Sequence, residues 1–172
     1  MMKIIKNKTV AEDSWSVLRL NEGDTVEGVD VPSGQIIVPL KVWLAQRAAL
    51  QQRADIGVWF ASDERAEALR DDVAKFSVIA VDFPKFADGR GYSIAYHLRN
   101  RLNYRAELRA IGDVLRDQLF YMQRMGFDAF AVRADKDIQD ALQGLNDFSL
   151  SYQASADNAQ PLYLRVERGG AR

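Results

Sequence analysis

The hexapeptide Asp88-Gly89-Arg90-Gly91-Tyr92-Ser93 is the stretch of this sequence with the most evident chemical potential. Glycine has no Cβ, so Gly89 and Gly91 allow positive φ angles and a close approach of the backbone to a ligand or another chain. Arg90 offers a planar pair of donors that suits phosphate, sulfite or carboxylate. The loop also leads into a predicted helix, whose free N–H groups favour an anion. We therefore predict that residues 88–93 bind a ligand or a partner.

The same hexapeptide has a structural interpretation, which the sequence leaves open. Asp88-Gly89 would be a tight turn, Ser93 would cap the helix, and Arg90 would pair with a nearby carboxylate. The stretch is not a dinucleotide-binding fingerprint, because the third glycine of G-x-G-x-x-G would fall at Ile94. A P-loop is absent from the sequence, which contains no Gly-Lys-Ser/Thr.

Three aspartates, Asp82, Asp113 and Asp117, are candidate catalytic residues. Asp113 and Asp117 are four residues apart, which predicts that both lie on one helix face with Arg116 beside them. Paired carboxylates can act as acid and base or hold Mg²⁺ through their oxygens. The structural alternative is that Asp113 caps the helix while Arg116 and Asp117 form surface ion pairs. We add Arg109 and Arg116 to the candidate binding residues, because both flank this turn.

Composition excludes several kinds of site. The chain has no cysteine and one histidine, so it cannot by itself carry Cys-ligated zinc, an iron–sulfur cluster or thiol catalysis. The sequence identifies no cofactor and no metal site. The formal net charge of -1 gives no field that would recruit nucleic acid or an anionic membrane. Between positions 88 and 124, however, there are seven arginines and four acidic residues, a bias that suits an oxyanion or an acidic protein surface, although a solvated helical face would show the same bias.

Length and patterning predict the elements that must position these residues. With 172 residues and 19.4 kDa, we expect a single domain over residues 1–172. Residues 1–34 form a β-rich N-terminal extension, with strands at 3–6 and 15–20, and residues 35–168 form a core of βα repeats. The start of the chain has no apolar run of signal-peptide length, and no segment is long enough to span a membrane, so a cytoplasmic location is the default expectation.

Along the core, short runs of apolar residues alternate with segments of helical periodicity. The apolar runs predict strands at 35–38, 56–61, 77–83, 107–111, 129–133 and 162–167. The segments of helical periodicity predict helices at 40–53, 63–75, 93–102, 114–125 and 135–145. Asp63 and Asp113 stand where helix N-caps would be, and Gly126 stands where a helix would end.

This alternation predicts an α/β fold with a mainly parallel sheet. Its strand order stays open between a partial TIM-like barrel and a doubly wound open sheet. In both architectures ligands bind at the carboxyl ends of the strands. We therefore expect the loops after Asp82 and Ile111 to share one rim, to which the loop after Phe60 adds Ser62 and Asp63.

Taken together, three runs resemble the bacterial domain-of-unknown-function 934 family. The runs are residues 86–93, 107–119 and 126–130, and Ile37-Val38-Pro39-Leu40 and Trp43 fit the family too. Proteins of this family are typically encoded beside assimilatory sulfite reductase and are often labelled as oxidoreductases acting in sulfite reduction. The resemblance thus implies a role in sulfate assimilation, but it supplies neither a mechanism nor catalytic residues.

Two functions remain open at this point. The first is an accessory protein of sulfite reduction, which docks on sulfite reductase or its electron donor or binds a small oxyanion. The second is a small α/β enzyme, either an oxidoreductase or an Asp-based acid/base enzyme, acting on a phosphorylated or sulfur-oxyanion substrate. Because no cofactor motif supports a self-contained oxidoreductase, we prefer the accessory role.

Overall fold

The structure, a computed structural model, describes residues 2–85 and 88–146. The strands are β1 (Met2–Lys6), β2 (Thr9–Asp13), β3 (Ser16–Val17), β4 (Ile36–Pro39), β5 (Ile56–Phe60), β6 (Val78–Phe83), β7 (Glu107–Gly112) and β8 (Ala129–Phe130). The α-helices are α1 (Leu40–Leu50), α2 (Arg90–Asn100), α3 (Arg116–Met125) and α4 (Ile138–Gln143). Three short 3₁₀ turns complete the described chain: η1 (Ala66–Leu69), η2 (Val73–Lys75) and η3 (Gly144–Asn146).

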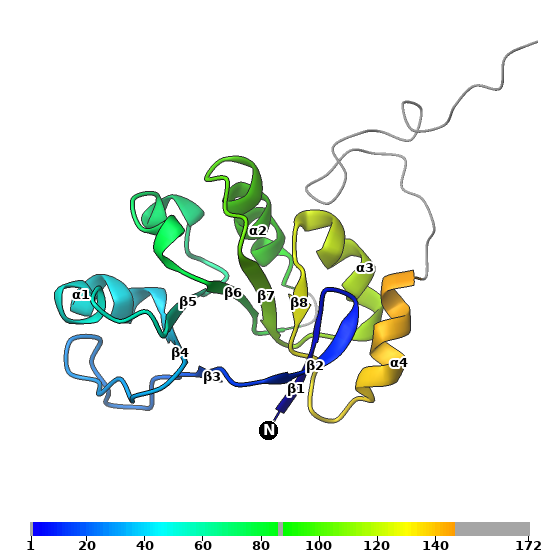
Figure 1. The fold of residues 1–172 in the computed structure, drawn as a ribbon, viewed down its shortest axis with the longest axis horizontal. Helices are drawn as coiled ribbons and strands as arrows, with labels where there is room; N and C mark the ends of the chain where they lie inside the picture. Colours follow the sequence, from blue (N-terminus) through cyan, green and yellow to red (C-terminus); the bar gives the residue numbers. More distant parts are fainter. Residues whose placement is uncertain (1, 86–87, 147–172) are drawn as a thin grey trace, which may run out of the picture.

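All eight strands belong to one curved, half-barrel sheet in the order β2-β1-β8-β7-β6-β5-β4-β3 (Figure 1). Strands β3 to β8 follow one another in chain order and are parallel, whereas β1 is antiparallel to both β8 and β2. The predicted mixed α/β fold with a mostly parallel sheet is therefore confirmed. The doubly wound alternative is wrong, because the order of the parallel strands does not reverse and α1, α2 and α3 all lie on the outer side of the curve.

The N-terminal strands bridge the two edges of the sheet. β2 and β3 lie at opposite ends of the strand order, yet only Ser14 and Trp15 separate them in the chain. Three Cα steps span at most about 11 Å, so the two edges must approach each other closely. In Figure 1, β3 runs below the arc of β4 to β8 toward β1 and β2. The concave face of the sheet is thus enclosed by the chain's own beginning.

Alternate residues of each strand face opposite sides of the sheet, as the two-residue period of a strand requires. On the outer side, Ile79, Val81 and Phe83 of β6 join the large core that packs against the helices. On the inner side, a smaller cluster is formed by Ile37, Val78, Ala80 and Ile111, covered by Trp15, Val17, Trp59 and Ala131. The enclosed interior is therefore a second, minor core.

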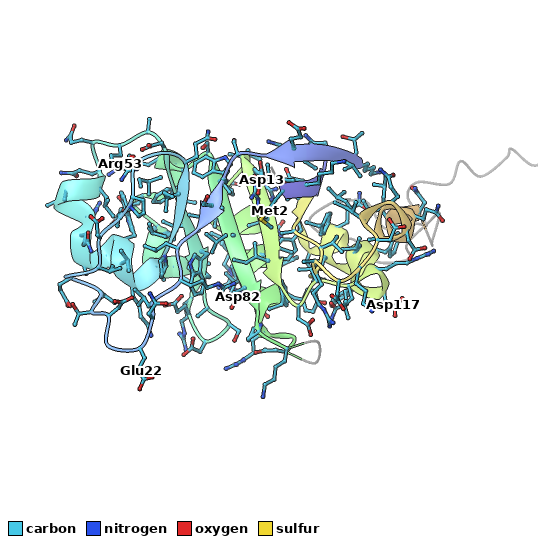
Figure 2. All side chains as sticks on the ribbon, turned by 90° about the horizontal axis from the view of Figure 1, so that it is seen from below. Met2, Asp13, Glu22, Arg53, Asp82 and Asp117 are labelled. Carbon is cyan, nitrogen blue, oxygen red and sulfur yellow. The ribbon has the colours of Figure 1, made fainter. Side chains whose placement is uncertain are left out.

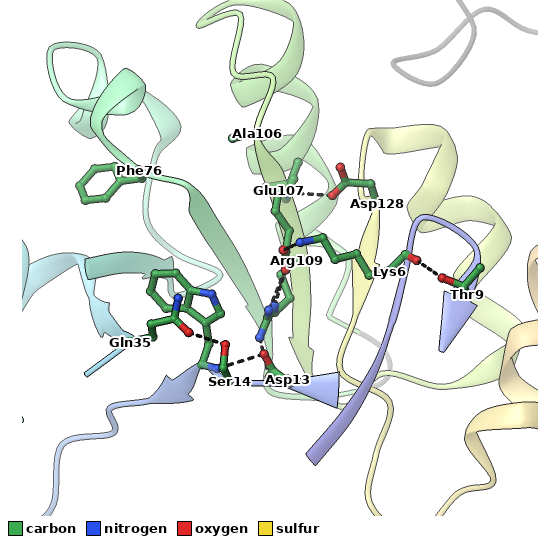
Figure 3. A network of polar contacts seen from close by, with 12 residues as sticks. Lys6, Thr9, Asp13, Ser14, Gln35, Phe76, Ala106, Glu107, Arg109 and Asp128 are labelled. Atoms are coloured by element: carbon green, nitrogen blue, oxygen red, sulfur yellow. Dashed lines mark hydrogen bonds and ion pairs between the residues drawn. The ribbon is translucent and has the colours of Figure 1, made fainter. Parts of the chain in front are cut away.

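A network of ion pairs lies in this interior (Figure 3). Arg109 on β7 is 2% exposed, and its Nη1 lies 2.8 Å from Oδ2 of Asp13 at the end of β2. Its Nη2 lies 2.7 Å from Oε1 of Glu107, whose Oε2 is 2.7 Å from Nζ of Lys6 on β1. A buried charge is tolerated only when it is paired and hydrogen-bonded. The network therefore binds β7 to both N-terminal strands across the interior.

Several expected elements differ from the structure. The segment 63–75 forms η1 and η2 instead of one helix, because Asp72 turns inward to accept a hydrogen bond from Trp43 and to pair with Arg47 and Lys75. The sequence pattern also missed β2, and α2 begins at Arg90, three residues earlier than expected. The strand expected at 162–167 lies outside the described residues. Within the described ranges, no helix has the length and apolar character to cross a membrane.

We expect Arg109→Met to destabilise the protein by about 3–5 kcal/mol, because it leaves Asp13 and Glu107 as buried carboxylates without their guanidinium. Urea unfolding followed by circular dichroism measures this loss. Arg70→Met, at an exposed arginine after η1, is the matched control and should change stability by less than about 0.5 kcal/mol. A loss below about 1 kcal/mol for Arg109→Met would show that the interior network does not hold the sheet edges together.

Candidate functional site

The carboxyl ends of β6 and β7 meet at one edge of the sheet, as the sequence predicts. Asp82 pairs in register with Ile111 and Phe83 with Gly112, and the carbonyl of Phe83 accepts a hydrogen bond from the N–H of Asp113 at 2.7 Å. Gly112 has a φ of 90°, and a Cβ there would lie 2.6 Å from Oδ1 of Asp82. A glycine is required at this position, so the two loops are held against each other.

Arg90 is oriented by two neighbouring loops. Its Nε and Nη2 donate to Oδ1 and Oδ2 of Asp88 at 3.0 and 2.9 Å, and Nη2 also donates to Oγ of Ser62 at 2.9 Å. The guanidinium holds the pKa of the Asp88 carboxyl well below its usual range. Among the described residues no hydrogen bond reaches Nη1 of Arg90, and the side chain is 63% exposed. The arrangement is a positioned guanidinium with donors directed to solvent.

The two glycines beside Arg90 have different roles. Gly89 is the N-cap of α2 with a φ of -87°. A Cβ added at Gly89 would lie 3.8 Å from its nearest neighbour, an atom of the Tyr92 ring. Gly91 lies within the first turn of α2, where an added Cβ would lie 2.8 Å from the Phe83 ring. Neither glycine has a positive φ, so that part of the prediction is wrong. Gly91 instead allows α2 to pack closely against β6.

Tyr92 and Ser93 complete the predicted loop but form the first turn of α2. The Tyr92 ring packs against Phe83 and Tyr121, and burial raises the pKa of its hydroxyl. Ser93 is exposed and lines a groove of about 240 Å³ with Arg90 and other residues of η1 and α2. Ser93 is not the N-cap, because the helix begins before it.

Asp82 forms an ion pair with an arginine from the N-terminal segment. Arg19 donates from Nη1 to Oδ2 at 3.1 Å and from Nη2 to Oδ1 at 2.9 Å, and Asp82 is 8% exposed. The guanidinium carbon of Arg19 also lies 4.7 Å from the centre of the Trp59 ring. In Figure 2 the labelled Asp82 lies near the middle of the sheet, toward the same side as Glu22. Asp82 is thus held by the segment that follows β3.

The other two candidate aspartates do not form a pair on one helix face. α3 begins at Arg116 with Leu115 as its N-cap, so the predicted cap at Asp113 is wrong. Asp113 instead accepts a hydrogen bond from Nη1 of Arg133 at 2.9 Å. Asp117 is exposed on α3 and lies apart from Asp82 in Figure 2. Arg116 donates to Oδ1 of Asp140 on α4 at 2.7 Å.

Arg109 is not on the rim, because its side chain lies inside the sheet with Asp13 and Glu107. The sequence analysis also missed Arg19, Trp59 and Arg133, which contact the predicted site residues from distant parts of the chain. Each of the three lies at or near the end of a predicted strand (15–20, 56–61 and 129–133), which was the available signal of a rim position. In the part of the chain that the structure describes, no three histidine, aspartate or glutamate side chains gather in a way that could hold a metal ion.

The chain was compared with known protein families, curated proteins and solved structures. A family model described as "Bacterial protein of unknown function (DUF934)" matches residues 57–163. No curated protein and no solved structure is significantly similar to the chain. The family match covers the rim residues from Ser62 to Arg133.

We expect Gly91→Ala to lower stability by about 1–3 kcal/mol, because its Cβ would press on the buried Phe83 ring. Gly89→Ala is the matched control, since the space around its Cβ is open and its backbone lies in an ordinary region; its effect should stay below about 0.5 kcal/mol. Thermal unfolding of both variants measures the difference. Equal melting temperatures for the two variants would contradict the close packing of α2 on β6.

Proposed function

This chain belongs to the bacterial DUF934 family, and from that premise we propose that it is a cytoplasmic accessory protein of assimilatory sulfite reduction. The protein docks on sulfite reductase or its electron donor, or binds a small oxyanion, through residues 88–93. What supports the biological setting is the resemblance to this family, whose members are typically encoded beside assimilatory sulfite reductase. The geometry of Arg90 supports the mode of action.

The carrying observation is that Arg90 is held in place, while no hydrogen bond from residues 2–85 or 88–146 reaches its Nη1. Asp88 and Ser62 engage Nε and Nη2, while Nη1 carries two further N–H groups on a mostly exposed side chain. A guanidinium already ordered by its neighbours loses less conformational entropy when it binds. Two N–H groups on one side of the fork suit a carboxylate on a partner surface or the oxygens of a small anion.

The position of this loop agrees with such a role. We interpret the half-barrel as a partial TIM-like arrangement of βα units, in which binding sites gather at the carboxyl ends of the strands. Ser62 follows β5, Asp88 follows β6 and Asp113 follows β7, so these residues come from three consecutive strand ends. A partner that contacts Arg90 would also meet the neighbouring loops.

The enzyme alternative has less support. An acid or base must exchange protons with a substrate, which requires a carboxylate with an accessible oxygen. Both oxygens of Asp82 are engaged by Arg19, and Asp113 is bound by Arg133. Asp88 is kept ionised by Arg90. Three of the aspartates therefore serve to position arginines, which favours binding over proton transfer.

We expect Arg90→Ala to weaken binding to purified sulfite reductase by about tenfold or more, because it removes the oriented guanidinium from the contact. The dissociation constant is measured by biolayer interferometry at low and moderate salt. Arg70→Ala removes the same charge from an exposed position outside the rim loops and is the matched control, with binding within about twofold of the wild type.

Two results would contradict the proposal. One is that the wild-type protein binds neither sulfite reductase, nor its electron donor, nor a small oxyanion such as sulfite. The other is equal affinity for Arg90→Ala and the wild type when circular dichroism shows the variant to be folded. Arg90 is exposed, so this variant should melt close to the wild type.

A further inference from the structure

A pocket of about 310 Å³ lies at the carboxyl ends of β4 and β5, beside the segment that follows β3. Its volume is at the lower end of the range of small-molecule sites, roughly 300–1,000 Å³. The residues that line it are Arg19, Leu20, Pro39, Lys41, Trp59, Ala61 and Glu64. We propose that this pocket binds a small organic anion with a planar ring, separately from the docking role of Arg90.

The pocket has a rigid aromatic wall. Nε1 of Trp59 donates to the carbonyl of Leu18 at 3.0 Å, which fixes the orientation of the indole. The guanidinium of Arg19 lies over this ring and is held in turn by both oxygens of Asp82. A guanidinium over a tryptophan ring is suited to a flat ligand ring, because both groups present delocalised faces. A ligand ring would therefore meet a surface that needs no reordering.

Positive charge lies on two sides of the pocket. Lys41, at the start of α1, is exposed and has no ion-pair partner among residues 2–85 and 88–146. Toward the described part of the chain, Arg19 donates two of its five N–H groups, both to Asp82, which leaves three that can reach an acceptor. A carboxylate, sulfonate or phosphate on the ligand can thus be bound between Lys41 and Arg19.

Glu64 gives the pocket an acceptor as well as cations. One of its oxygens, Oε2, accepts the N–H of Ala61 at 2.7 Å, and this bond anchors the side chain against the end of β5. Burial raises the pKa of this half-buried carboxyl. The second oxygen can accept a hydrogen bond from a ring N–H or hydroxyl. A ring N–H or hydroxyl on the ligand is therefore an additional contact, which a flat anion without a donor does not need.

The test uses 2-naphthoate as the probe and the indole N–H signals of the tryptophans in a ¹H–¹⁵N spectrum as the readout. Trp59→Phe and Trp15→Phe assign those two signals and leave the third to Trp43. Trp43 serves as an internal reference because it is buried outside the pocket, bonded to Asp72. The neutral 2-naphthamide tests the need for charge, and acetate tests the need for a ring. Lys41→Gln is compared with Lys85→Gln, which removes the same charge from an exposed loop position after β6.

We expect 2-naphthoate to shift the Trp59 signal in a saturable way while the Trp43 signal stays unchanged. Lys41→Gln should weaken this binding about fivefold or more, and Lys85→Gln should leave it within about twofold. 2-Naphthamide should bind more weakly than 2-naphthoate, and acetate should cause no shift at the same concentration.

Four results would overturn the proposal: no shift of Trp59, equal shifts of Trp59 and Trp43, equal affinity for 2-naphthoate and 2-naphthamide, or unchanged affinity in Lys41→Gln. Because the experiment uses this protein alone, its failure leaves the docking role of Arg90 untouched. Failure of docking on sulfite reductase likewise leaves this pocket untouched.

Discussion

The ion pair between Arg109 and Asp13 is the interaction on which the rest of the structure depends. These residues lie 96 positions apart, and their contact ties the end of β2 to the centre of the sheet. Immediately after Asp13 the chain passes through Ser14 and Trp15 to β3 at the opposite sheet edge. The same path carries Arg19 over Trp59 and against Asp82. The polar interior thus places the N-terminal segment, and that segment builds one side of the rim.

The rim consists mostly of arginines held by carboxylates. Arg19 is held by Asp82, Arg90 by Asp88 and Arg133 by Asp113 and Asp135. In each pair the arginine is at least partly exposed to solvent, and ion pairs at a protein surface usually contribute below about 1 kcal/mol to stability. Their physical effect is to order long side chains before a partner or ligand arrives. A surface of ordered guanidinium groups favours recognition of anions more than it favours proton transfer.

The sequence predicted what depends on local pattern and missed what depends on distant contacts. Short apolar runs correctly predicted β4 to β7, because buried strands are rich in Val, Ile and Phe. Gly126 ends α3 with a φ of 114°, as the sequence also predicted. The sequence pattern did not predict β2, because its residues are partly exposed, two of them are acidic, and they form no apolar run. The rule on strand ends predicted that the loop with Ser62 lies beside the loop with Arg90, but not the hydrogen bond between these two residues. The pairing of Arg19 with Asp82 spans 63 positions, and no local spacing reveals it.

The order of the strands also determines when this sheet can be completed. β1 leaves the ribosome before the other strands of this sheet, but one of its two neighbours is β8, near residue 130. Until then, β4 to β7 can assemble stepwise as each strand appears, whereas one edge of β1 has no partner. Contacts between such distant segments are slow to form because a long loop must close first. β1 therefore completes its pairing only after β8 has been made, and until then a newly made chain exposes one unpaired edge of β1.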